Sequence, residues 1–321
     1  MRNLYAIHRA PLNEDVTVGE SFTHRCDMAD TAPFNHPKPK EILSTLLPFL
    51  KVAGAYAAQI QQGISARPDK YEGDHLFANA LTDADLSIQT FMEVVLLAKF
   101  PSMRFYGEEY ETTYNTKYFK AIDLGPQGDY LITLDPIDGT LYYKDGHPHY
   151  LVILTILNAD EFEAAIALSP ANDCYYYSLR NQGTFKGAMS DELDECKPLK
   201  IEDPGDTVLL GWALSDLAEK ARSQFSSVID IKNDYSKATP VPPINGLLTG
   251  EVAGVMLASA QFIDTAALAW MASEMGYQIS TFDGADLPPL STCENYRRSE
   301  IIVSATEKMQ QQLIELAKAR A

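Results

Sequence analysis

The pattern of apolar and polar residues predicts two helices followed by several strands in the first part of the chain. In residues 40–63 apolar residues recur at the spacing of an amphipathic helix, with a kink expected at Pro48. A second helix is expected over residues 82–99, with its N-cap at Thr82 or Asp83. Apolar runs then predict strands at residues 130–134, 150–157, 164–168 and 174–179. No helical pattern separates the last three, so we expect them to form an antiparallel meander.

After about residue 204, strand and helix patterns alternate. Strands are expected over residues 207–212, 228–232 and 300–304, and helices over residues 215–225, 264–275 and the C-terminal segment. Such alternation is typical of a layered α/β domain. We therefore expect three parts, which are an N-terminal extension of residues 1–39, an α+β domain of residues 40–204 with an antiparallel sheet, and an α/β domain of residues 205–321.

The excess of acidic residues changes which partners are expected. The chain carries 26 Lys and Arg against 44 Asp and Glu, a formal net charge of −18. Such a surface repels nucleic acid backbones and anionic lipid headgroups, and no basic run offsets it, so we expect neither nucleic acid nor membrane as a partner. Residues 252–272 are long enough to span a membrane, but Asp264 near the middle favours a buried segment. The start of the chain lacks the apolar run of a signal peptide and the four cysteines are scattered, which predicts a cytoplasmic protein.

Residues 134–140, Leu-Asp-Pro-Ile-Asp-Gly-Thr, carry the strongest chemical signal. An apolar strand leads into Asp135, and Pro136 is expected to end the strand ladder and force a turn. Asp135 and Asp138 would then lie together on a rigid corner, where Gly139 lets the backbone approach a ligand closely. Oxygen-only groups of this kind suit Mg²⁺ better than zinc. An ordinary β-turn with Asp and Gly in their usual positions is the alternative for a shorter D-x-x-D-G match.

Other acidic residues occur at the expected ends of elements. Glu108 and Glu109 follow Gly107 at a predicted strand end, where paired glutamates are more often solvated surface. Asp85 lies in the first turn of the second helix, where the helix dipole alone would favour an acid. Asp264 opens an Ala-rich helix in apolar surroundings, and either an N-cap or a metal ligand explains it.

Together these segments resemble the inositol monophosphatase superfamily of Mg²⁺-dependent phosphomonoesterases. The D-P-I-D-G-T string is highly specific, and weaker matches follow the same order over most of residues 40–310: Thr82–Asp85, Gly107–Glu109, Gly183, Asp264–Ala267, Glu274–Gly276 and Asp283–Gly284. The resemblance implies a layered αβαβα sandwich of the sugar-phosphatase type, combining α+β and α/β parts, with most of the metal ligands in residues 40–204. It also implies two or three Mg²⁺ ions, a small phosphorylated substrate, a homodimer and sensitivity to lithium.

The same resemblance assigns roles residue by residue. The metal ligands would be Glu108, Asp135, the Ile137 carbonyl, Asp138 and Asp264, with Asp85 serving a third ion or the attacking water. The catalytic groups would be Thr140, whose hydroxyl orients the water, together with Asp85 and Glu108. The phosphate and the rest of the substrate would contact Gly139 and Thr140 through backbone N–H groups, and Asp138 and Thr239 as well.

Three departures from the family pattern bear on the substrate. Leu257 stands where inositol phosphatases place a hydroxyl-binding glutamate, Ile263 replaces a tryptophan, and the substrate loop survives only as Ser236–Thr239. Inositol phosphate itself is therefore less favoured than another small phosphate monoester. A 3′(2′),5′-bisphosphate nucleotidase or a fructose-1,6-bisphosphatase on the same scaffold stays open as an alternative. From another class, a non-catalytic acidic protein that binds cations stays open too.

Overall fold

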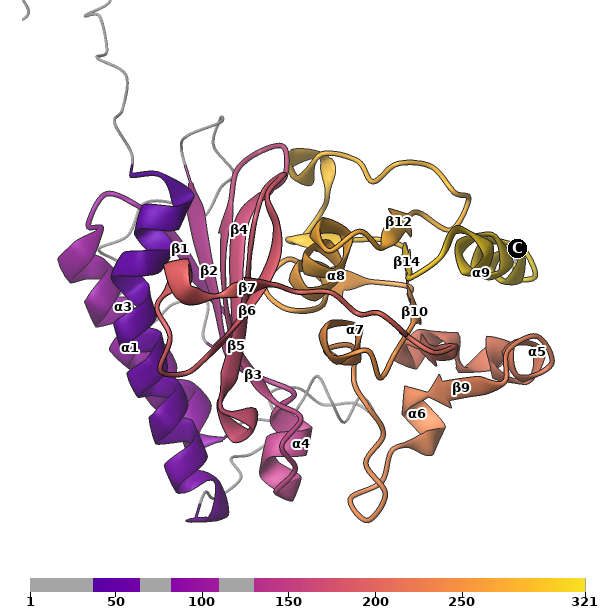
Figure 1. Cartoon of the computed structure of the whole chain (residues 1–321), viewed down its shortest axis with the longest axis horizontal. Helices are drawn as coiled ribbons and strands as arrows, with labels where there is room; N and C mark the ends of the chain where they lie inside the picture. Colours follow the sequence, from indigo (N-terminus) through magenta and orange to yellow (C-terminus); the bar gives the residue numbers. More distant parts are fainter. Residues whose placement is uncertain (1–36, 64–81, 110–129, 321) are drawn as a thin grey trace, which may run out of the picture. The chain divides into compact units, whose positions relative to one another are not determined.

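Helices and β-sheets alternate in five layers (Figure 1). The computed structural model describes residues 37–63, 82–109 and 130–320, and the expected extension of residues 1–39 lies almost entirely outside them. Residues 36–321 group together by their contacts. The expected division of this part at residue 204 stays a prediction.

The first layer consists of the two predicted helices. Helix α1 (Pro39–Ile60) buries its apolar face, runs through Pro48 and continues into the short 3-10 helix η1 (Gln61–Gly63). By length and composition this segment could cross a membrane, but its apolar face packs in the protein core beside the first sheet. Helix α3 (Asp83–Lys99) begins as predicted, because the Thr82 side chain caps it by accepting a hydrogen bond from the Ala84 N–H.

The second layer is a seven-stranded sheet in which the strands follow one another in chain order. Its strands are β1 (Arg104–Gly107), β2 (Leu131–Asp138), β3 (Leu151–Leu157), β4 (Phe162–Ser169), β5 (Cys174–Leu179), β6 (Gly183–Ala188) and β7 (Lys197–Pro198). The predicted antiparallel meander is present from β2 onward. One edge of the sheet adds a parallel strand to this meander, because β1 pairs parallel to β2. Short helices α4 (Thr140–Asp145), η3 (Pro170–Asn172) and η4 (Leu193–Glu195) connect the strands.

A second sheet of five strands lies across a layer of helices from the first (Figure 1). Its strands, in spatial order, are β12 (Gln278–Ser280), β14 (Ile301–Ser304), β10 (Gly254–Leu257), β8 (Thr207–Leu210) and β9 (Ser227–Asp230). Helix α8 (Thr265–Glu274) and the short α7 (Gly246–Thr249) lie between the sheets, while α5 (Ala218–Arg222) and α9 (Glu307–Ala317) cover the outer face (Figure 1). The remaining elements are η5 (Trp212–Leu217), α6 (Ile231–Asp234), η6 (Leu290–Thr292) and the pair β11 (Ala260–Gln261) and β13 (Arg297–Arg298).

Some predicted boundaries in this half are wrong. The strand expected over residues 207–212 ends at Leu210, since a 3-10 helix begins at Trp212. The helix expected over residues 215–225 is divided between that 3-10 helix and α5. The strand expected over residues 228–232 ends at Asp230, whose side chain caps α6 by accepting a hydrogen bond from the Lys232 N–H.

Three apolar cores fill the spaces between the layers. One core joins α1 and α3 to one face of the first sheet, a second packs the other face of that sheet around α8, and a third joins the second sheet to α5 and α9. Alternate residues of each central strand point to opposite faces, as Val152 and Ile153 of β3 do. The layered αβαβα arrangement predicted from the resemblance is confirmed, and the first sheet is rigidly held on both faces.

Candidate active site

A β-bulge in β2 brings two of the predicted acids to the same place. Asp135 pairs with Ile153 and Asp138 with Leu151, so three steps along β2 match two steps along β3. The turn expected at Pro136 is therefore wrong: β2 continues to Asp138. Pro136 has no backbone N–H, but it is accommodated because not every residue of a bulge has to donate a hydrogen bond to the neighbouring strand. The Asp135 side chain stabilises the bulge by accepting a hydrogen bond from the Ile137 N–H at 3.0 Å.

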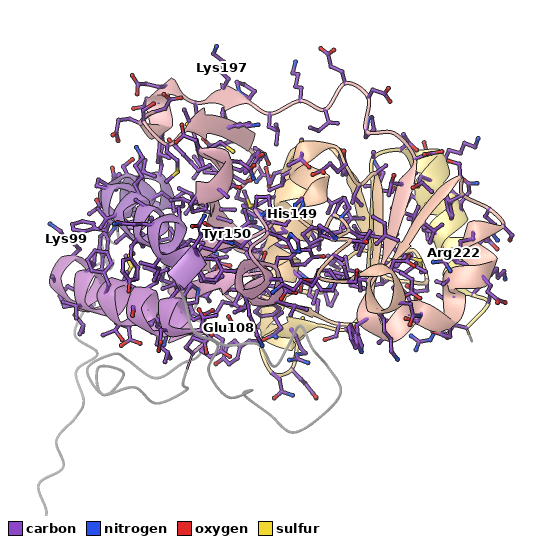
Figure 2. All side chains as sticks on the ribbon, turned by 90° about the horizontal axis from the view of Figure 1, so that it is seen from below. Lys99, Glu108, His149, Tyr150, Lys197 and Arg222 are labelled. Carbon is purple, nitrogen blue, oxygen red and sulfur yellow. The ribbon has the colours of Figure 1, made fainter. Side chains whose placement is uncertain are left out.

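Two other segments add acids to this position. Parallel pairing of β1 with β2 aligns Gly107 with Leu134, and the Glu108 N–H donates to the Leu134 carbonyl at 3.1 Å. Glu108 is thereby held beside Asp135. Asp264, the N-cap of α8, arrives from the C-terminal half. In Figure 2, His149 lies near the centre of the view and Glu108 lies below it.

Three carboxylates are close enough to share a cation. One oxygen from each of Asp135, Asp138 and Asp264 lies within 4.8 Å of the other two, and no other such group of His, Cys, Asp or Glu occurs in the described segments. Asp135 is buried, and Asp138 and Asp264 are half-buried. These three residues and Glu108 are four of the acids to which the sequence resemblance assigned metal binding.

The acids strongly influence one another's protonation. Burial raises the pKa of Asp135 well above its ordinary value, and the charges of Glu108, Asp138 and Asp264 raise it further. Burial also raises the pKa of Asp138 well above its ordinary value, with Asp264 and Glu108 adding to the effect. The pKa of Asp264 is raised to about 6, chiefly by burial, although hydrogen bonds from Thr265 oppose the shift. Without a cation, this cluster therefore tends to retain protons.

Thr140 connects the cluster to helix α3. Its hydroxyl lies 2.8 Å from the Ile137 carbonyl oxygen and 3.3 Å from Asp85 Oδ1. Asp85 is fully buried and is fixed by hydrogen bonds from both the N–H (2.8 Å) and the hydroxyl of Thr82. The predicted pairing of Thr140 with Asp85 is thus present in the structure, while Asp85 stands outside the group of three acids. Thr140 also begins α4, as expected for an anion-binding helix start.

The structure does not join Thr239 to the acids through any hydrogen bond of the described residues. Thr239 pairs with Ser236 in a tight loop. That loop packs on α4 through the His147 Nε2, which lies 2.9 Å from the Lys237 carbonyl. His147 and His149, which flank Pro148, are both half-buried.

Sequence reasoning missed one residue beside the segment of Glu108, Gln89 on α3. Its Oε1 accepts a hydrogen bond from the Glu109 N–H at 2.7 Å, and its Nε2 donates to the Glu109 carbonyl and, at 3.0 Å, to Glu93 Oε1. The available signal was spacing: Asp85, Gln89 and Glu93 recur every four residues on the buried side of the helix. Polar residues in a row on a buried face indicate a polar network.

Two features of the backbone require glycine at residue 139, namely a positive φ and a close approach of another segment, and a substitution there tests both. Its φ is +80°, and a Cβ there would lie 2.7 Å from the His149 carbonyl oxygen. We expect Gly139→Ala to lower the free energy of unfolding by about 2 kcal/mol or more, from left-handed backbone strain plus the clash. Gly146→Ala is the matched control, because its φ is +87° but nothing lies within 4 Å. Urea unfolding should show a clearly smaller loss for the control, and equal losses would contradict the clash.

The comparison with known proteins agrees with this geometry. The family model described as "Inositol monophosphatase family" matches residues 43–320. The chain belongs to the inositol monophosphatase family. Membership of this family implies a phosphatase, which is a hydrolase, and a small phosphorylated substrate.

The inositol monophosphatase fold is also found in more distant solved structures. An IMPase of Thermotoga maritima superposes with a TM-score of 0.64 at 16% identity, covering 87% of this chain and 97% of that one. The SuhB protein of Bartonella henselae gives 0.63 at 17% identity, covering 87% and 98%. An inositol-1-monophosphatase of Rhizobium meliloti is 27% identical over 108 residues, which are 34% of this chain and 37% of that relative.

Proposed function

We propose that this family member hydrolyses a small phosphate monoester in a Mg²⁺-dependent reaction centred on Asp135, Asp138, Asp264 and Glu108. The observation that carries the proposal is the cluster of three carboxylates whose oxygens lie within 4.8 Å of one another. Such a cluster is unfavourable when fully ionised and becomes favourable around a cation. Because its donors are all oxygens, a hard ion such as Mg²⁺ fits better than zinc.

The residues of this chain would divide the remaining tasks. When bound, Mg²⁺ would neutralise the carboxylates and stabilise negative charge on the transferring phosphate. The Thr140 hydroxyl can donate to Asp85 and accept a hydrogen bond from water. Thr140 and Asp85 together would therefore orient a water molecule and help to remove its proton. Backbone N–H groups at the start of α4 would face the phosphate. Phosphoryl transfer needs little more than such positioning and charge.

A cavity of about 280 Å³ offers space for the alcohol part of the substrate. Leu151, the β3 partner of Asp138, lies in its wall, and Ser169 and Cys174 on the next two strands continue the same row across the sheet. Asn245 also lines the cavity. Its side chain is nine-tenths buried and has no hydrogen-bond partner in the part of the chain that the structure describes. We infer that this amide binds a polar group of the substrate.

Removing the amide tests this role. We expect Asn245→Leu to raise KM about 3- to 10-fold, the effect of one lost hydrogen bond, with kcat little changed. Stability should not fall, because the amide has no partner within the described protein. Initial rates over a range of substrate concentrations, with thermal unfolding alongside, provide the measurement. An unchanged KM would contradict the proposed use of the cavity.

A substrate panel tests the proposed function itself. Initial rates would be measured on inositol phosphate, fructose 1,6-bisphosphate and 3′-phosphoadenosine 5′-phosphate, each with Mg²⁺ and with EDTA. We expect Mg²⁺-dependent phosphate release from at least one small monoester. The preferred substrate decides between the alternatives on this scaffold, and Leu257, buried in β10, already argues against inositol phosphate. A protein that binds Mg²⁺ but hydrolyses no phosphate monoester would be the non-catalytic alternative.

A further inference from the structure

The side chain of Gln89 holds the backbone of the residue next to Glu108. Its amide pairs with both main-chain polar groups of Glu109, accepting from the N–H at 2.7 Å and donating to the carbonyl. A glutamine amide placed in this way reproduces the two-bond pairing of a strand ladder, at the point where β1 has ended. Gln89 is almost fully buried, so water does not compete for these hydrogen bonds.

The strand that leads to Glu108 has a glycine, Gly107, at the position next to this amide. A Cβ on Gly107 would lie 2.5 to 2.7 Å from the Cδ, Oε1 and Nε2 atoms of Gln89. The glycine therefore leaves the space that the amide group fills, on one side of Glu108. On the other side, Glu109 carries the two hydrogen bonds. The Gln89 side chain of α3 thus contacts both neighbours of Glu108 in the chain, Gly107 and Glu109.

Helix α3 contacts the site at a second point one turn away. Asp85, four residues before Gln89, lies 3.3 Å from the Thr140 hydroxyl at the start of α4. Residues four apart share a helix face, so one rigid face of α3 holds both Thr140 and the segment of Glu108. These two segments come from the ends of different strands, β1 and β2. Their separation is consequently fixed by the helix.

We propose that Gln89 is a positioning residue that fixes the Glu108 carboxylate relative to Asp135 and so tunes the affinity of the acid cluster for its cation. The inference rests on the proposed Mg²⁺-dependent function and deepens it. Groups that orient metal ligands through hydrogen bonds commonly change metal affinity or activity 10- to 100-fold when removed. Gln89 acts through the backbone of Glu109, and it touches neither phosphate nor cation.

The test compares two glutamines with the same kind of environment. Gln89→Met removes the amide while keeping the length of the side chain. Gln310→Met is the matched control, because Gln310 is also buried and also forms two hydrogen bonds, with Ser304 and Ser280 at 2.7 Å each, in the second sheet. Isothermal titration of each full-length protein with MgCl₂, without substrate, measures cation affinity directly. Urea unfolding of each variant shows whether it is folded.

We expect Gln89→Met to weaken Mg²⁺ binding by about 10-fold or more and Gln310→Met to leave it unchanged, although both lose stability. In the activity assay, Gln89→Met should need a higher Mg²⁺ concentration to reach half of its maximal rate, with little change in KM for the substrate. Gln89→Glu keeps the acceptor that faces the Glu109 N–H, so its Mg²⁺ affinity should lie between those of wild type and Gln89→Met.

Three outcomes would overturn the inference, and the third would also overturn the proposed function. Unchanged Mg²⁺ affinity in folded Gln89→Met would show that Gln89 is only structural. An equal loss in Gln310→Met would show that general destabilisation, and not positioning, weakens binding. Failure of the wild-type protein to bind Mg²⁺ would refute the proposed function as well, which distinguishes that failure from the first two.

Discussion

Replacing Asp135 with asparagine is expected to abolish phosphatase activity while making the metal-free protein more stable. Asp135 is buried, and the charges of Glu108, Asp138 and Asp264 all oppose its ionisation. The amide removes one negative charge but still offers an oxygen to the Ile137 N–H. Loss of a cation ligand should lower kcat/KM by about a thousand-fold or more, equivalent to about 4 kcal/mol of transition-state stabilisation. In EDTA at pH 7.5, the free energy of unfolding should rise by about 1 kcal/mol or more, since like charges no longer repel.

Asp230→Asn is the matched control for this prediction. Asp230 is equally buried and also lies in a strand, as the last residue of β9, but its partners are hydrogen-bond donors, with Ser215 Oγ at 2.7 Å and Asn233 Nδ2 at 2.6 Å. We expect the control to lose stability and to keep its kcat. Activity near the wild-type level in Asp135→Asn would show that the acid cluster is not the active centre. A metal-free Asp135→Asn protein less stable than wild type would show that the acids do not repel one another in the folded state.

The elements that could be predicted from the sequence are those in which apolar residues recur at a clear helical or strand spacing. Helix α3 starts at its predicted N-cap because Thr82 and the first-turn acids give a local signal that the tertiary structure does not contradict. The meander of β3, β4 and β5 was predictable because each strand is a largely apolar run, buried on both faces. The boundaries near Leu210 and Trp212 were not, since an aromatic residue after an apolar run extends a strand pattern and begins a 3-10 helix equally well.

In the site, residue types were predictable and geometry was not. The string at residues 134–140 located two acids, but its proline suggested a turn where the chain forms a bulge. A sequence alone does not show at which residues of a strand a backbone N–H is not needed for pairing. The parallel pairing that carries Glu108 to Asp135 joins segments 27 residues apart, and no local pattern encodes it. Gln89 was overlooked because a single glutamine is common on any helix. Only the structure shows its amide against the Glu109 backbone.

Stability of the metal-free protein is expected to fall as the pH rises from 5 to 7.5, and Mg²⁺ should reverse this trend. The pKa of Asp264 is raised from 3.8 to about 6 by burial, and those of Asp135 and Asp138 are raised as well. Between the unfolded and folded pKa values, the unfolded chain has released protons that the folded protein still binds, so raising the pH favours unfolding. For Asp264 alone the full loss is about 3 kcal/mol, of which about 1.4 kcal/mol falls between pH 5 and 7.5.

Thermal unfolding in EDTA and in excess MgCl₂ across this pH range provides the measurement. Because the cation binds the ionised carboxylates, the rise in Tm caused by Mg²⁺ should grow with pH. His149 acts in the opposite direction, since burial lowers its pKa and its neutral form gains stability as the pH rises. That contribution is common to wild type and Asp135→Asn, so the difference between their pH profiles isolates the acid cluster. A Mg²⁺ shift of constant size from pH 5 to 7.5 would contradict the assignment of these carboxylates as the cation site, because binding would then release no protons.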